Sequence, residues 1–135
     1  MTITTIYNAV SLGSTSSKVN QSPTRTAGQT TTTSWILTAR INSQTGLNYV
    51  PGAEVEIYYA VLPVSLTADA TLPPAVGPNA GVLRCRLNQL GSTDKFTVSP
   101  QIPNNGGYLY TWWNSPALAP SGTAPTLTVY STELP

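Results

Sequence analysis

The chain has 135 residues, a net charge of +1 and a charged fraction of only 8%. A chain of this length typically forms one domain and buries roughly two thirds of its unfolded surface. It contains no histidine, the side chain that most often serves as general base, proton shuttle or metal ligand near neutral pH. The low net charge argues against the basic surface of a nucleic-acid-binding protein, so we expect no nucleic-acid partner.

The N-terminal region divides into an apolar segment and a polar one. Residues 2–12 are rich in β-branched side chains and predict a first strand. Residues 14–33 are rich in Ser, Thr and Gln and predict an arm or long loop. We therefore divide the chain into an N-terminal strand and arm, residues 1–33, and a sandwich domain, residues 34–135. No apolar run is long enough to span a membrane and no secretory signal is recognisable, so we expect no membrane partner.

We expect the arm to dock on a neighbouring subunit or on a capsid, for example by adding a strand to an exposed sheet edge. The alternative is that residues 2–12 complete the protein's own sheet. The apolar residues that would carry the docking are Ile3, Ile6, Val10 and Leu12.

Alternating apolar and polar residues predict further strands at 34–42, 54–61, 83–88, 96–98, 108–113 and 126–130. No segment shows the 3.6-residue apolar period of a helix. Long Pro-rich loops are predicted at 62–81, 100–107 and 116–125. The sequence thus predicts an all-β fold, a single antiparallel β-sandwich of jelly-roll or immunoglobulin-like type. Its expected core comprises Trp35, Leu37, Ile41, Val55, Ile57, Leu83, Leu87, Leu109, Leu127 and Val129.

Few residues offer chemistry. Glu54 and Glu56 share one side of a strand, where a glycosidase could use two carboxylates. Arg84 and Arg86 have the same spacing on a later strand, so cross-strand ion pairs are the favoured interpretation. Cys85 cannot form an internal disulfide and is expected to be a small buried side chain. We find no Ser-His-Asp triad, phosphate-binding glycine loop or metal-ligand spacing, and predict no catalytic residue, cofactor or metal.

One strand carries an aromatic stripe, formed by Tyr108, Tyr110 and Trp112. Exposed aromatic rings can stack on sugar rings or bind a partner protein. A place in the core or in a subunit interface is favoured over a sugar platform. If this face packs into the core, Leu109, Thr111 and Trp113 are left facing outward.

The closing region, from Gly106 to Trp113 and then through residues 127–130, resembles the C-terminal strands of small β-sandwich virion proteins of tailed bacteriophages. The Thr-, Ser- and Asn-rich surface and the lone cysteine are similar to that class too. The resemblance implies a capsid decoration or cement protein, made in the host cytoplasm and located in the virion. It also implies partners: further copies of the chain, as a trimer, and the major capsid protein or other virion proteins.

Two alternatives remain at this point. One is a tail, neck or fibre protein of the same particle. The other is a carbohydrate-binding module that uses the aromatic stripe to bind a surface glycan.

Overall fold

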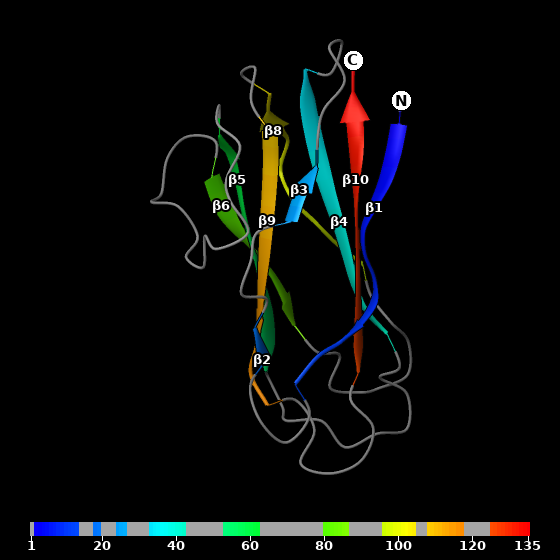
Figure 1. The fold of residues 1–135 in the computed structure, drawn as a ribbon, viewed down its shortest axis with the longest axis vertical. Helices are drawn as coiled ribbons and strands as arrows, with labels where there is room; N and C mark the ends of the chain where they lie inside the picture. The colour runs from blue at the N-terminus through cyan, green and yellow to red at the C-terminus, as the bar shows by residue number, and fades with distance from the viewer. Residues whose placement is uncertain are drawn as a thin grey trace.

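The structure is a computed structural model that describes residues 2–13, 18–19, 24–26, 33–42, 53–62, 80–86, 96–104, 108–117 and 125–135. Within these ranges every regular element is a strand and none is a helix (Figure 1). The strands are β1 (Thr2–Ser11), β2 (Lys18–Val19), β3 (Thr24–Thr26), β4 (Ser34–Asn42), β5 (Glu54–Leu62), β6 (Ala80–Arg86), β7 (Phe96–Val98), β8 (Ile102–Pro103), β9 (Tyr108–Ser115) and β10 (Thr126–Leu134).

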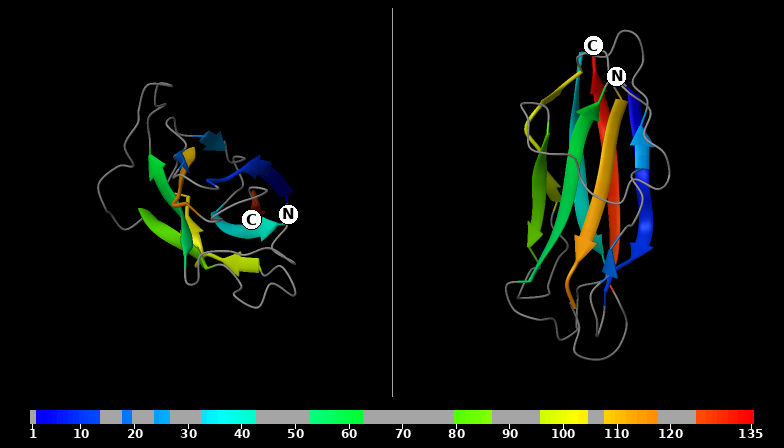
Figure 2. Two further views of the ribbon diagram at one scale, coloured as in Figure 1. Left: turned by 90° about the horizontal axis from the view of Figure 1, so that it is seen from below. Right: turned by 60° about the vertical axis from the view of Figure 1, so that its left-hand side comes forward.

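These strands form two antiparallel sheets. Sheet A has the order β1-β10-β4-β7, and β8 also pairs with β4. Sheet B has the order β2-β9-β5-β6, and β3 also pairs with β9. The end-on view shows the sheets as two facing layers (Figure 2). The prediction of an all-β sandwich is confirmed.

The strand pairing is nested: the first strand pairs with the last, and strands further inside the sequence pair with one another in turn. β1 pairs with β10, β2 and β3 pair with β9, β4 pairs with β7 and β8, and β5 pairs with β6. Contacts of β10 with β4 and of β9 with β5 then join these hairpin arms into the two sheets. This is the strand order of a jelly roll. In an immunoglobulin-like sandwich the first two strands share a sheet, whereas β1 and β2 lie in different sheets here.

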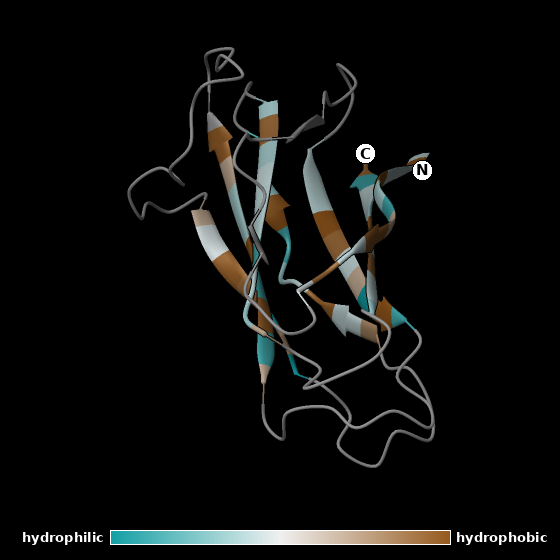
Figure 3. Cartoon of the chain, turned by 60° about the horizontal axis from the view of Figure 1, so that its bottom comes forward, coloured by the Kyte–Doolittle hydropathy of each residue, from teal (hydrophilic) through white to brown (hydrophobic). Residues whose placement is uncertain are grey.

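Alternation along the long strands decides which side chains enter the core. In β4 and β10 each residue that faces inward is buried and each residue that faces outward is partly exposed. Apolar and polar segments follow one another along the strands in Figure 3. Every predicted core residue within the described ranges is buried, and Leu87 lies outside those ranges.

Hydrogen bonds also cross from one sheet to the other. The Tyr7 hydroxyl on β1 donates to the carbonyl oxygen of Thr111 on β9 at 3.1 Å and lies 3.0 Å from its Oγ1. The Gly13 amide donates to Ser115 Oγ at 3.2 Å. Along β1 the register shifts twice, and Ala9 has a φ of 50°. β1 is thus an irregular edge strand tied to both layers.

The structure corrects several predicted loops. Two short strands, β2 and β3, lie within the polar segment 14–33 and pair with β9. The predicted loop 100–107 contains β8, where Ile102 pairs with Trp35 and is buried. β6 begins three residues before the predicted start at Leu83. These pairings depend on strands far away in the sequence, which local composition does not report.

Candidate functional site

The aromatic stripe lies on the outer face of sheet B. Leu109 and Trp113 belong to the main core between the sheets, and Thr111 is fully buried with them. The expectation that a buried stripe leaves these three residues facing outward was therefore wrong. Tyr110 and Trp112 point to the opposite side of β9, as the alternation of a strand requires.

The stripe is nevertheless buried. Tyr110 is 1% exposed and Trp112 is 2% exposed, and they form a second small cluster with Ala60. Their ring centroids lie 6.3 Å apart at 34°, within the range of a favourable aromatic pair. Tyr108 is partly buried against the same cluster. A sugar needs an open ring face for stacking, and neither Tyr110 nor Trp112 offers one in this structure.

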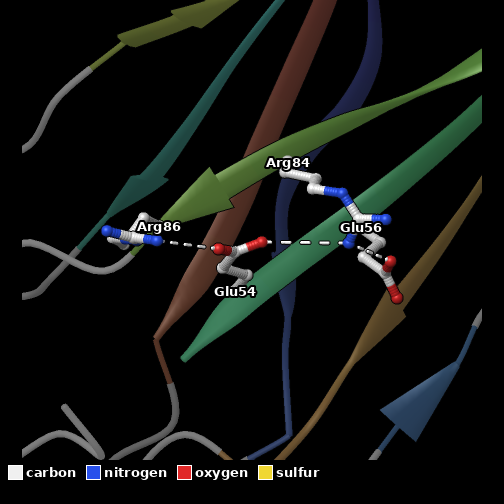
Figure 4. Close-up of polar contacts among 4 residues, drawn as sticks. All are labelled: Glu54, Glu56, Arg84 and Arg86. Atoms are coloured by element: carbon white, nitrogen blue, oxygen red, sulfur yellow. Dashed lines mark hydrogen bonds and ion pairs between the residues drawn. The ribbon is translucent and has the colours of Figure 1, made fainter. Parts of the chain in front are cut away.

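The same face of sheet B carries a ladder of ion pairs (Figure 4). Arg84 Nη1 lies 2.6 Å from Glu56 Oε2 and 3.9 Å from Glu54 Oε2, and Arg86 Nη2 lies 3.2 Å from Glu54 Oε1. The cross-strand register places Glu54 opposite Arg86 and Glu56 opposite Arg84. The predicted ion pairs are confirmed, and each glutamate is held by a guanidinium group.

This ladder is a solvated surface feature. The side chains of Arg84 and Arg86 are 59% and 70% exposed, and exposed pairs of this kind contribute about 0–1 kcal/mol each. β6 is the edge of sheet B, and charged side chains on an edge strand oppose unwanted strand pairing with other molecules. The ladder therefore favours this register of β5 and β6 and places charges on an edge of sheet B.

The four apolar residues expected to dock the N-terminal segment lie in or beside β1. Leu12 is 3% exposed within the main core, and Ile6 and Val10 pack against that core from partly buried positions. Only Ile3 is exposed, at 63%. β1 pairs with β10 of its own chain over most of its length. In the structure this segment thus completes the protein's own sheet, the alternative weighed above, and docking on another subunit stays a prediction.

The outer face of sheet A was not singled out from the sequence. Phe96 and Val98 on β7 are 55% and 57% exposed there. The Arg40 guanidinium on β4 lies over the Phe96 ring, 5.3 Å from its centroid, which is a cation–π contact. Arg40 Nε is buried and has no hydrogen-bond partner in the described part of the chain. The sequence alone could not predict that Phe96 and Val98 are exposed, because their exposure depends on which elements cover the outer face of sheet A.

Two reactive groups are buried. Cys85 is 2% exposed, and burial raises the pKa of its thiol to about 11 although a hydrogen bond with Thr97 opposes the shift. The prediction of a buried cysteine is confirmed. Glu133, 4% exposed, continues the inward-facing series on β10, and its Oε2 is buried without a hydrogen-bond partner among the residues that the structure describes. The alternation of β10 was a signal for this placement, but the predicted strand stopped at residue 130.

Comparisons with protein-family models, with curated proteins and with solved structures gave no match. In the described ranges, no group of three or more His, Cys, Asp or Glu residues could hold a metal ion. The same part of the chain contains no helix that is long and apolar enough to cross a membrane. The candidate functional surfaces are therefore the two outer sheet faces.

Proposed function

We propose that this chain is a non-enzymatic structural component of a bacteriophage virion, a capsid decoration or cement protein that stabilises the shell. The nested strand order carries the proposal: β1 with β10, β2 and β3 with β9, β4 with β7 and β8, and β5 with β6. Viral capsid domains, lectins and cupins are the main users of this architecture. The fold alone does not assign a function, so the surfaces must discriminate among these users.

The surfaces favour protein contact. The outward residues of β4 and β10 in sheet A are mostly hydroxyl and amide residues, and the charged fraction of the chain is 8%. Such faces pack against other proteins with little cost for removing charges from water. We therefore include self-association and contact with the major capsid protein or other virion proteins in the proposal.

The carbohydrate-binding alternative has less support, because Tyr110 and Trp112 are covered. A glycan array tests it directly. Binding of a sugar that is lost in Trp112→Ala, with the fold retained in circular dichroism, would favour a lectin over a decoration protein.

The decisive experiment for the proposed function is mass spectrometry and cryo-electron microscopy of purified particles from the phage that encodes this chain. A decoration protein is expected at many copies, in a regular array on the outer shell. Density confined to the tail, neck or fibre would move the protein to that part of the particle. Absence of the chain from purified particles would refute a virion role.

A further inference from the structure

The outer face of sheet A concentrates the exposed apolar surface of the described residues. Four large apolar side chains are exposed among the described residues. Three of them, Ile3, Phe96 and Val98, lie on this face. Ile3 pairs in register with Thr132, and Val98 pairs with Thr38, so these side chains stand on the solvent side of β1 and β7. The fourth, Val82, lies on sheet B beside the ion-pair ladder. Because β1 and β7 are opposite edges of sheet A, the exposed apolar side chains flank the polar outer residues of β10 and β4 from both sides, and a face with several exposed large apolar side chains is a candidate interaction surface.

The same face carries very little charge. The described strands of sheet A contain two charged residues. Arg40 points outward, and Glu133 points into the core. The Arg40 guanidinium is already stacked on Phe96, and a guanidinium is weakly hydrated and tolerates a covered position better than an ammonium group. Covering this face therefore costs less desolvation than covering the two glutamates and two arginines of sheet B.

The size of the face suits a weak but specific contact. The strands of sheet A are β1, β10 and β4 with nine or ten residues each and β7 and β8 with three and two; at about 4.8 by 3.3 Å per residue they give a face of roughly 520 Å². Two such faces together bury about 1,000 Å², the lower limit expected of a specific interface.

We propose that two copies of this chain pack face to face through the outer faces of their A sheets, with Ile3, Phe96 and Val98 in the contact. This inference rests on the self-association included in the proposed function and names the surface that carries it. It proposes a dimer in place of the trimer that the resemblance implies. The threonines of β4 and β10 favour a second copy as the occupant. A hydroxyl both donates and accepts hydrogen bonds, so a face rich in threonine is complementary to itself. Packing of two sheets about 10 Å apart is also a common arrangement.

The test is analytical ultracentrifugation of the full chain over about 1 µM to 1 mM. The wild type is expected to be a dimer at the upper end. Val98→Asp and Phe96→Asp should each raise the dimer dissociation constant about tenfold or more, because each buries a charge in an apolar contact. Val82→Asp is the matched control, since it places the same charge on the other sheet face and should leave the dissociation constant unchanged. Circular dichroism and thermal melts establish that each variant is folded.

The remaining outcomes separate this inference from the proposed function. A dissociation constant of about 1 mM is on the order of the weakest specific contacts. If the wild type is still a monomer at about 1 mM, the proposed dimer is wrong. A trimer, or a dimer that both β7 variants leave intact, shows self-association through another surface and overturns the role of sheet A alone. In each case the location of the chain in particles is still decided by microscopy.

Discussion

The Tyr7 hydroxyl tests whether the N-terminal strand belongs to the protein's own sandwich. Tyr7 is 5% exposed, and its hydroxyl is within 3.1 Å of the carbonyl oxygen and within 3.0 Å of Oγ1 of Thr111. The two residues lie 104 positions apart and on opposite sheets. In Tyr7→Phe the ring is kept and both hydrogen bonds are lost.

The expected cost follows from these contacts. A buried hydrogen bond contributes about 0.5–1.5 kcal/mol net, so the loss of two predicts a decrease of about 1–3 kcal/mol in the free energy of unfolding. For a chain of this size, that corresponds to a fall in Tm of roughly 4–10 °C. Urea denaturation followed by tryptophan fluorescence measures the free energy, and differential scanning calorimetry measures the Tm.

Tyr130→Phe is the matched control. Tyr130 is partly exposed on the outer face of sheet A, opposite Thr5 of β1 and Thr38 of β4, and its hydroxyl should contribute less than about 0.5 kcal/mol. Both variants are measured in dilute protein, below the range of association. Equal, small effects from Tyr7→Phe and Tyr130→Phe would refute the placement of β1 across the sandwich. They would favour the prediction that residues 2–12 dock on another molecule.

Three further predictions concern the core. Leu37 is fully buried, so Leu37→Ala should lower the free energy of unfolding by about 2–5 kcal/mol in urea titrations, and a loss below 1 kcal/mol would contradict that burial. A Cβ on Gly81 would lie 2.5 Å from Tyr59 Oη, so Gly81→Ala should lower the Tm. Adding Tyr59→Phe to that variant removes the hydroxyl and should recover part of the lost Tm. If the effects of the two substitutions on the Tm are simply additive, the two side chains do not touch. The folded-state pKa of Cys85 is raised from 9.0 to about 11 by burial, so the stability it contributes is complete below pH 9 and falls by roughly 2–3 kcal/mol as the pH rises through 11. Cys85→Val should remove that part of the pH dependence, and a thiol that reacts equally fast in native and unfolded protein would contradict its burial.

The inward residues of the regular strands could be predicted from the sequence alone. In β4, alternation identified Trp35, Leu37 and Ile41 as core positions before any partner strand was known, because successive side chains of a strand point to opposite faces. The same reasoning located the pairing of Glu54 and Glu56 with arginines, since two residues at a spacing of two must share a side. The pattern within each strand is enough to show which residues share a face, and the equal spacing of two glutamates and two arginines suggested that these two strands are neighbours.

The tertiary structure decided the rest, because those features depend on residues distant in the chain. β9 has apolar or aromatic residues on both faces, so its alternation could not show that Trp113 enters the main core and Trp112 the second cluster. Burial of Ile102 requires Trp35 as its neighbour across β8 and β4, and the jelly-roll order requires the first strand to pair with the last. Local propensity fixes the period of a strand, whereas the choice of its neighbours depends on how the whole set of strands buries its apolar faces together.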